Sequence, residues 1–393
     1  MKESAARVIY ALKRWLALLL AVLCVCSCSV AVMESAGTAP DITLPEDFVP
    51  GEDDSFGGSA GDIGMTALTK SDFDADDLPE EYQLPSENPG SVIKIRYTTY
   101  NNVTMADLMM YANNPIHTIT ADDKIVKHVL VYLPAGYDES EECYNILYLL
   151  HGSSSSPSRY LDPDKPTVLQ NILDHMIEDG LIEPMIVVAA TYYPQDEMIK
   201  SLPLSMKVQT VRTFPDELVN DIIPQVEKKV RTYAASTSLE DIVASRDHRA
   251  IAGFSLGGVA TWYTFHQQMQ AFRWYLPISE AGWDDGRGGL TGILDSNVSA
   301  QALYNSVMAQ GYGPEDFMLF VATGSDDEAF EVTTNQMISL LEYNDMFIVG
   351  TNTSCSMMSN GTHTTDALYT YAYHILPSLF VELSATADAP VTE

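Results

Sequence analysis

The chain has 393 residues, enough for one large domain or two modest ones, and 46% of the residues are hydrophobic and can build a core. Its 54 acidic and 21 basic residues give a formal net charge of −33 at pH 7. Because this charge repels phosphate backbones and anionic lipid head groups, the composition argues against nucleic acid and against an anionic membrane surface as partners.

Residues 1–27 have the pattern of a secretory signal peptide. Several basic residues precede the apolar run "WLALLLAVLCVC", which is short for a membrane span. The following "VCSC" resembles a bacterial lipobox ending at Cys28, but Cys26 is unusual within such a motif. Lipidation of Cys28, which would attach the protein to a membrane, and ordinary cleavage nearby therefore both stay open. Either outcome predicts an extracellular or cell-surface protein.

The rest of the chain divides by composition. Residues 28–90 are rich in Gly, Pro, Ser, Asp and Glu and contain few apolar clusters, so we predict a flexible acidic linker there. Residues 91–382 have the texture of one folded domain. Residues 383–393 are expected to form a disordered tail.

Apolar or alternating runs of strand length recur through residues 91–382 and alternate with segments of helical periodicity. The predicted strands cover 91–100, 124–137, 144–152, 182–193, 248–255, 272–279, 315–325 and 345–353. The predicted helices cover 169–180, 214–233 with a break at Pro224, 256–269, 333–344 and 365–380. This alternation predicts an α/β fold with a mainly parallel central sheet flanked by helices.

The stretch "RAIAGFSLGGVATWYTF", residues 249–265, carries the most informative motif. A G-x-S-x-G match alone is weak, but here an apolar strand precedes Ser255 and a helical pattern follows it. This arrangement is typical of a nucleophile elbow, a strained strand–turn–helix connection flanked by small residues such as Gly253 and Gly257. We predict that Ser255 is a nucleophile and that the N–H of Leu256 is one donor of an oxyanion hole. The alternative is an inert serine in a glycine-rich turn.

A serine nucleophile needs a histidine to take its proton and a carboxylate to orient that histidine, and in this kind of fold they follow in the order serine, acid, histidine. Three histidines follow Ser255 in the sequence, and two of them, at positions 266 and 374, lie within predicted helices. His363 lies in a loop just before the last helix, so it is the predicted base. The acid is expected after the strand 315–325, where we favour Asp327 over its neighbour Asp326.

The second oxyanion donor is expected in the loop after an early strand. "LYLLHGSSSS" provides that loop, and the residue after His151 and Gly152 is Ser153, whose N–H we predict to be the donor. We expect His151 to support this loop rather than to take part in the chemistry. The sequence has no His/Cys cluster with metal-ligand spacing, and serine ester chemistry needs neither a metal nor an organic cofactor.

These residues lie within a larger resemblance. The chain resembles the esterase D / feruloyl esterase-type branch of the α/β-hydrolases, which includes carbohydrate esterase family 1. The matching segments follow the family's order: "VLVYLPAGYDESEECYNILYLLHG", "FPDELVNDIIPQVEKKVRTYA", "DHRAIAGFSLGGVATW", "LPIS", "ATGSDD" and "GTHTTDALYTYAYHILPSLF". The resemblance implies an α/β-hydrolase fold and acyl-ester chemistry. It carries the family's nucleophile, acid and base onto Ser255, Asp327 and His363.

The chain departs from the family at two places. Family members often carry G-H-D-W at the histidine, whereas Thr364 and Thr365 follow His363 here. Glycine commonly follows "PIS" in the family, where this chain has Glu280. Both departures weaken the implied preference for feruloyl esters without affecting the three catalytic candidates.

The candidate substrate-pocket residues are His151, Tyr192 at the start of a long loop, and Trp283. We expect a secreted serine carboxylic-ester hydrolase that removes feruloyl or acetyl groups from xylan or its oligosaccharides, so its partner is an acylated polysaccharide or oligosaccharide. The alternatives are an acyltransferase, an esterase for siderophores or small acyl esters, and an inactive surface protein that binds carbohydrate. The sequence predicts neither the acyl group nor an oligomeric state.

Overall fold

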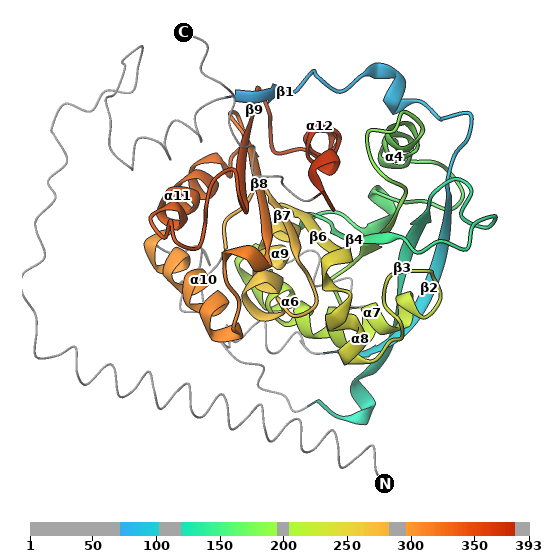
Figure 1. Ribbon diagram of the computed structural model, residues 1–393, viewed down its shortest axis with the longest axis horizontal. Coiled ribbons are helices and arrows are strands. Elements are labelled where there is room, and N and C mark those ends of the chain that lie inside the picture. The colour runs from blue at the N-terminus through green and yellow to red at the C-terminus, as the bar shows by residue number, and fades with distance from the viewer. Residues whose placement is uncertain (1–70, 102–118, 195–203, 283–295, 382–393) are drawn as a thin grey trace, which may run out of the picture. The chain divides into compact units, whose positions relative to one another are not determined.

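The computed structural model of the protein describes residues 71–101, 119–194, 204–282 and 296–381 (Figure 1). The predicted signal segment 1–27, Cys28, the linker up to residue 70 and the tail 383–393 lie outside these ranges. No helix within them is both long and apolar enough to cross a bilayer.

The described residues form one nine-stranded sheet with the strand order β1-β9-β8-β7-β6-β4-β5-β3-β2 (Figure 1). The strands are β1 Ser71–Asp74, β2 Ser91–Tyr100, β3 Lys124–Leu133, β4 Asn145–Leu150, β5 Met185–Ala190, β6 Arg249–Phe254, β7 Trp274–Ile278, β8 Met318–Gly324 and β9 Thr353–Ser359. β3 pairs antiparallel with both β2 and β5, and the other neighbours are parallel. The predicted mainly parallel α/β fold is confirmed. The central strands are buried on both faces, which explains their nearly continuous apolar runs.

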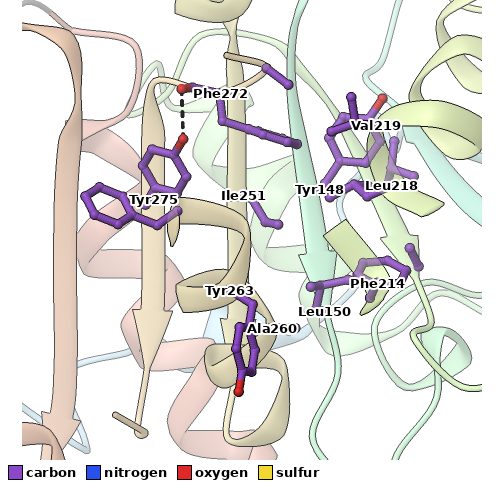
Figure 2. Packing of buried hydrophobic residues seen from close by; sticks show 14 of the residues in the cluster. Tyr148, Leu150, Phe214, Leu218, Val219, Ile251, Ala260, Tyr263, Phe272 and Tyr275 are labelled. Atoms are coloured by element: carbon purple, nitrogen blue, oxygen red, sulfur yellow. Dashed lines mark hydrogen bonds between the residues drawn. The ribbon is translucent and has the colours of Figure 1, made fainter. Parts of the chain in front are cut away.

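Helices cover both faces of the sheet (Figure 1). One face carries α4 Val168–Glu178 and α12 Thr365–Ile375. The other face carries α6 Leu204–Glu217, α7 Ile223–Glu227, α9 Leu256–Gln267, α10 Ser296–Gln310 and α11 Phe330–Leu341. Figure 2 shows part of the core on this second face, where Leu150 of β4 and Phe214 of α6 lie close together beside Ile251 of β6. A short helix, α8 Leu239–Ala244, precedes β6.

The predicted helix 214–233 is interrupted, as expected from Pro224. α6 is followed by a π-helical turn, Leu218–Ile222, and then by α7, in which Pro224 occupies the first turn. A proline has no N–H to donate to the preceding turn, and a π turn is one way for a helix to continue past it. The helix begins at Leu204, ten residues earlier than the pattern predicted.

The predicted strand 345–353 is wrong. Met346 and Phe347 are buried in the core as part of a turn region, and Gly350, with a φ of 76°, helps to reverse the chain. The strand at this point is instead β9, "TSCSMMS", most of whose residues are only half-buried. β9 is the second strand from the edge of the sheet and its faces are less covered than those of the central strands, so its sequence shows little strand pattern.

The predicted linker 28–90 is too long at its C-terminal end. Residues 71–74 form β1, which pairs in parallel with β9, and a 3-10 turn, Glu80–Gln83, packs against α4. Phe73 and Tyr82 are the anchors, because both rings are buried in the core cluster beneath α4 and α12. Two aromatic residues spaced among polar ones are enough to dock this segment. The folded domain therefore includes residues 71–90.

Candidate active site

The turn at Ser255 connects β6 to α9 and is strained. Ser255 has φ 55° and ψ −124°, a conformation that residues other than glycine rarely adopt. Its N–H donates to the carbonyl oxygen of Ile278 at 3.0 Å, which ties the turn to β7. A Cβ at Gly253 would lie 2.1 Å from the carbonyl oxygen of Gly257, and one at Gly257 would lie 2.3 Å from that of Leu150. The flanking glycines are therefore required by close backbone contacts.

The structure brings Ser255, His363 and Asp327 into one hydrogen-bonded chain. The Nε2 atom of His363 lies 2.8 Å from Ser255 Oγ, and its Nδ1 atom lies 2.7 Å from Asp327 Oδ1. The same Oδ1 accepts the N–H of Ala329 at 2.7 Å. Since the carboxylate can only accept, Nδ1 carries the proton that it donates to Asp327, and Nε2 is the acceptor for the serine hydroxyl.

Each member of this chain comes from a different connection at the carboxyl edge of the sheet. Ser255 follows β6, Asp327 lies between β8 and α11, and His363 lies between β9 and α12. The Asp327 side chain is fully buried, whereas that of His363 is 19% exposed. The histidine therefore reaches solvent while the carboxylate is shielded, and Ser255 is largely buried, with 7% of its surface exposed.

Electrostatics at the site raise the pKa of His363. Burial lowers the pKa of the imidazole, but the hydrogen bond and the charge of Asp327 raise it, and the carboxylates of Glu328 and Glu280 raise it further. The outcome is a pKa above the usual value for histidine. An imidazolium formed by taking the serine proton is thus stabilised where it forms.

The other candidates for acid and base lie elsewhere. Asp326 is exposed, and its carboxylate accepts a hydrogen bond from the hydroxyl of Ser325 at 3.5 Å. His374 stacks on Phe73 with ring centroids 4.2 Å apart and lies 3.7 Å from a carboxylate oxygen of Asp77. Of the two neighbouring aspartates, it is Asp327 that the structure places against His363.

The two predicted oxyanion donors lie on neighbouring backbone segments. Leu256 is the first residue of α9, so its N–H belongs to the unpaired first turn of that helix. Leu150 of β4 is in register with Gly253 of β6, so the segment that leads to Ser153 runs beside the elbow. A Cβ at Gly152 would lie 3.5 Å from that of Ser255, which places this backbone in van der Waals contact with the nucleophile.

His151 and Tyr192 support the oxyanion loop. Both are buried, and the ring nitrogens of His151 lie 2.8 Å from the Gly152 carbonyl oxygen and 2.8 Å from Thr191 Oγ1. The hydroxyl of Tyr192 donates to the carbonyl oxygen of His151 at 2.8 Å. The expected support of the loop by His151 agrees with these contacts, and the assignment of His151 and Tyr192 to a substrate pocket stays a prediction. Trp283 lies outside the described residues.

Two residues of the oxyanion region were missed from the sequence. The hydroxyl of Tyr193 and the ammonium of Lys207 both donate to the carbonyl oxygen of Ser153. Bonds to a backbone carbonyl from residues 40 and 54 positions away leave no sequence pattern. Among the described residues, no group of three His, Cys, Asp or Glu side chains could hold a metal ion.

Comparison with protein families places this site in a known context. The Esterase family model, described as "Putative esterase", matches residues 126–340, which is more than half of the chain. The chain belongs to the Esterase family. The matched range contains the oxyanion loop, the elbow and Asp327, and His363 follows it.

Two curated relatives carry names from plant cell-wall degradation. The chain is 30% identical over 309 residues to "Endo-1,4-beta-xylanase Y" of Acetivibrio thermocellus, a match that covers 77% of this chain and 24% of that protein. It is 32% identical over 135 residues to "Endo-1,4-beta-xylanase/feruloyl esterase" of Xylanibacter ruminicola, covering 33% of this chain and 16% of the relative. The chain thus spans a quarter or less of the length of these larger proteins.

Solved structures narrow the similarity to the feruloyl esterase type. A serine-to-alanine mutant of the feruloyl esterase module from Clostridium thermocellum, complexed with sinapinate, is 28% identical with a TM-score of 0.63, and the match covers 82% of this chain and 99% of that module. A CE1 ferulic acid esterase from Anaeromyces mucronatus shares the fold, at 17% identity and a TM-score of 0.52 over 79% of this chain and 98% of the other. The predicted α/β-hydrolase of the feruloyl esterase type is confirmed.

Proposed function

We propose that this protein is a serine esterase that releases hydroxycinnamoyl groups, feruloyl above all, from plant xylan or its oligosaccharides. The observation that carries the proposal is the hydrogen-bonded chain from Ser255 through His363 to Asp327, set on a strained elbow. The similarity to a feruloyl esterase module complexed with sinapinate supports the acyl group. The xylanase names of the two curated relatives support the polysaccharide.

In the proposed reaction, Ser255 Oγ attacks the ester carbonyl while His363 Nε2 takes its proton. The resulting imidazolium stays bonded to Asp327, whose buried negative charge stabilises it. The N–H groups of Leu256 and Ser153 donate to the oxyanion of the tetrahedral intermediate. His363 then gives its proton to the sugar hydroxyl as the C–O bond breaks, which leaves the acyl group on the serine.

Hydrolysis of the acyl-enzyme uses the same groups. His363, neutral again, takes a proton from water as the water oxygen attacks the acyl carbonyl, and the second tetrahedral intermediate collapses to release the acid and Ser255. Transfer to another alcohol differs only in the nucleophile that enters at this step. We favour water because no feature of the described site is specific to a second alcohol.

We also propose that the protein acts outside the cytoplasm, either released or held at the cell surface through a lipidated Cys28. The pattern of residues 1–27 and the lipobox-like "VCSC" support export. Xylan is too large to enter a cell intact, so an esterase for it has to be exported. Detection of the protein in the membrane fraction, and its loss from that fraction in a Cys28→Ser variant, tests the anchor.

The test of the function has two stages. A fluorophosphonate probe should label the wild type and not Ser255→Ala. Equal labelling of the two proteins, or labelling of neither, would refute the serine mechanism and favour an inactive binding protein. An ester panel of methyl ferulate, methyl sinapate, acetylated xylan and p-nitrophenyl acetate, read by the acid released, then identifies the acyl group. Faster turnover of acetylated xylan than of methyl ferulate contradicts the feruloyl assignment, and ester formation with added sugar alcohols that outpaces acid release indicates a transferase.

A further inference from the structure

The backbone around Ser153 is held from both sides. The Gly152 carbonyl oxygen accepts the N–H of Ser155 at 3.1 Å, and His151 Nδ1 lies 2.8 Å from it. The Ser153 carbonyl oxygen accepts the hydroxyl of Tyr193 at 2.6 Å and lies 3.4 Å from the ammonium of Lys207. Two consecutive peptide groups are therefore fixed, and the N–H of Ser153 belongs to the first of them.

This anchoring determines where the Ser153 N–H points. A trans peptide is planar, so the N–H of Ser153 points opposite to the Gly152 carbonyl. The bonds to the Gly152 carbonyl set one plane, and those to the Ser153 carbonyl set the next, which leaves the backbone dihedrals of Ser153 little freedom. An oxyanion donor works only if it is already aimed when charge develops.

Tyr193 and Lys207 come from outside the loop that they hold. Tyr193 follows β5, and Lys207 lies in the first turn of α6. Both are buried, and the Lys207 ammonium lies 5.7 Å from the centre of the Tyr193 ring, so the phenol and the cation pack against each other. Burial raises the pKa of Tyr193 to about 12, so its hydroxyl stays a donor over the range in which esters are assayed.

We propose that Tyr193 and Lys207 are positioning residues of the oxyanion hole, acting on the transition state through the Ser153 carbonyl. Neither needs to touch the substrate. The cation adds a second effect, because a positive charge at a peptide carbonyl withdraws electrons from the adjoining backbone and favours negative charge nearby. The inference rests on the proposed serine mechanism: Tyr193 and Lys207 hold the peptide that follows Ser153, while His151 and the Ser155 N–H hold the peptide that carries the donor.

The test compares Tyr193→Phe with Tyr275→Phe, a matched control. Tyr275 is equally buried and donates to the carbonyl oxygen of Phe272 at 2.9 Å, a bond drawn in Figure 2 at the end of β7 that lies away from Ser255. With methyl ferulate and p-nitrophenyl acetate, the kcat of Tyr193→Phe should be about tenfold lower than that of the wild type, with KM within twofold. This decrease is smaller than the roughly 10²- to 10³-fold decrease caused by removing a whole oxyanion donor. Tyr275→Phe should keep kcat within twofold. Lys207→Met should resemble Tyr193→Phe, and Lys207→Arg should recover most of the loss.

A tetrahedral analogue separates positioning from general destabilisation. A trifluoromethyl ketone analogue of methyl ferulate, which forms an oxyanion on Ser255, should bind the Tyr193→Phe enzyme about tenfold more weakly, whereas ferulic acid should bind unchanged. Two results would overturn the inference: equal weakening of both ligands, or a kcat within twofold of wild type for both Tyr193→Phe and Lys207→Met. In either case the proposed function still holds if the fluorophosphonate labels Ser255. If the fluorophosphonate does not label the wild-type protein, the proposed function itself is refuted.

Discussion

The substitution Asp327→Asn removes the buried charge of the site and keeps its shape. Asp327 Oδ1 accepts two N–H donors at 2.7 Å, from His363 and Ala329, whereas Oδ2 has no hydrogen-bond partner among the described residues. The amide oxygen of asparagine should therefore take the Oδ1 position, because an NH₂ group there would face two donors. This placement preserves the tautomer of His363 but removes the charge that stabilises its imidazolium.

The magnitude follows from that distinction. An acid-to-amide change that also reverses the tautomer costs about 10⁴ in kcat, so loss of the charge with the tautomer kept should cost about 10³, or ~4 kcal/mol of transition-state stabilisation. The pH profile should also move. Wild-type kcat/KM should rise as pH increases through a His363 pKa that lies above the usual value, and in Asp327→Asn this acid limb should shift to lower pH because the largest charge that raises the pKa is gone.

The assay is hydrolysis of methyl ferulate from pH 5 to 9, with Asp326→Asn as the matched control. Asp326 is adjacent in sequence and exposed, and it is not among the carboxylates that raise the pKa of His363, so its variant should keep kcat within twofold. A larger loss in Asp326→Asn than in Asp327→Asn refutes the assignment of the acid. A kcat for Asp327→Asn within fivefold of wild type refutes the reasoning about the buried charge.

Three further substitutions test other parts of the structure. Glu280→Gln should shift the acid limb of kcat/KM to lower pH, but by less than Asp327→Asn does, because Glu280 is one of the weaker charges that raise the pKa of His363. An acid limb that stays in place or moves to higher pH contradicts this. Gly253→Ala should abolish fluorophosphonate labelling and lower Tm, since the added methyl group would lie 2.1 Å from a backbone oxygen, and normal labelling shows that the turn can relax. Arg249→Met should lower the free energy of unfolding in urea by about 3–5 kcal/mol, because it leaves the fully buried Glu227 carboxylate without the guanidinium that binds it at 2.7 and 2.8 Å. Adding Glu227→Gln should recover part of this loss, and no recovery argues against the buried charge as its cause.

The catalytic chain could be predicted because connectivity constrains it. A mainly parallel sheet gathers the loops after its strands at one edge, so a serine after β6, an aspartate after β8 and a histidine after β9 must meet there. Chain order selected His363, and the position in the turn favoured Asp327 over Asp326. That choice between neighbours depends on side-chain burial, which the sequence does not state.

The errors have physical causes as well. The pattern over 345–353 is apolar because Met346 and Phe347 fill the core from a turn, while β9 itself is half-buried and has little pattern to detect. The segment 71–90 has the polar composition of a linker, and its anchors are two buried rings, Phe73 and Tyr82, together with hydrogen bonds to α4 such as that of the Gly90 N–H to Asp174. Contacts such as those of Tyr193 with a backbone carbonyl depend on the folded path of the chain and have no counterpart in residue spacing.

The short strand β1 gives the domain a mechanical property. The backbone just after it is bonded to the end of β9, where the Ala75 N–H donates to the Ser359 carbonyl oxygen at 3.0 Å, and Asn360 Nδ2 lies 3.2 Å from an Asp74 carboxylate oxygen. Asn360 lies only three positions before His363. A pull on β1 from its N-terminal side would therefore act on the end of β9 and on the loop that leads to the catalytic histidine. Displacement of β1 and the alignment of the base are thus expected to be coupled.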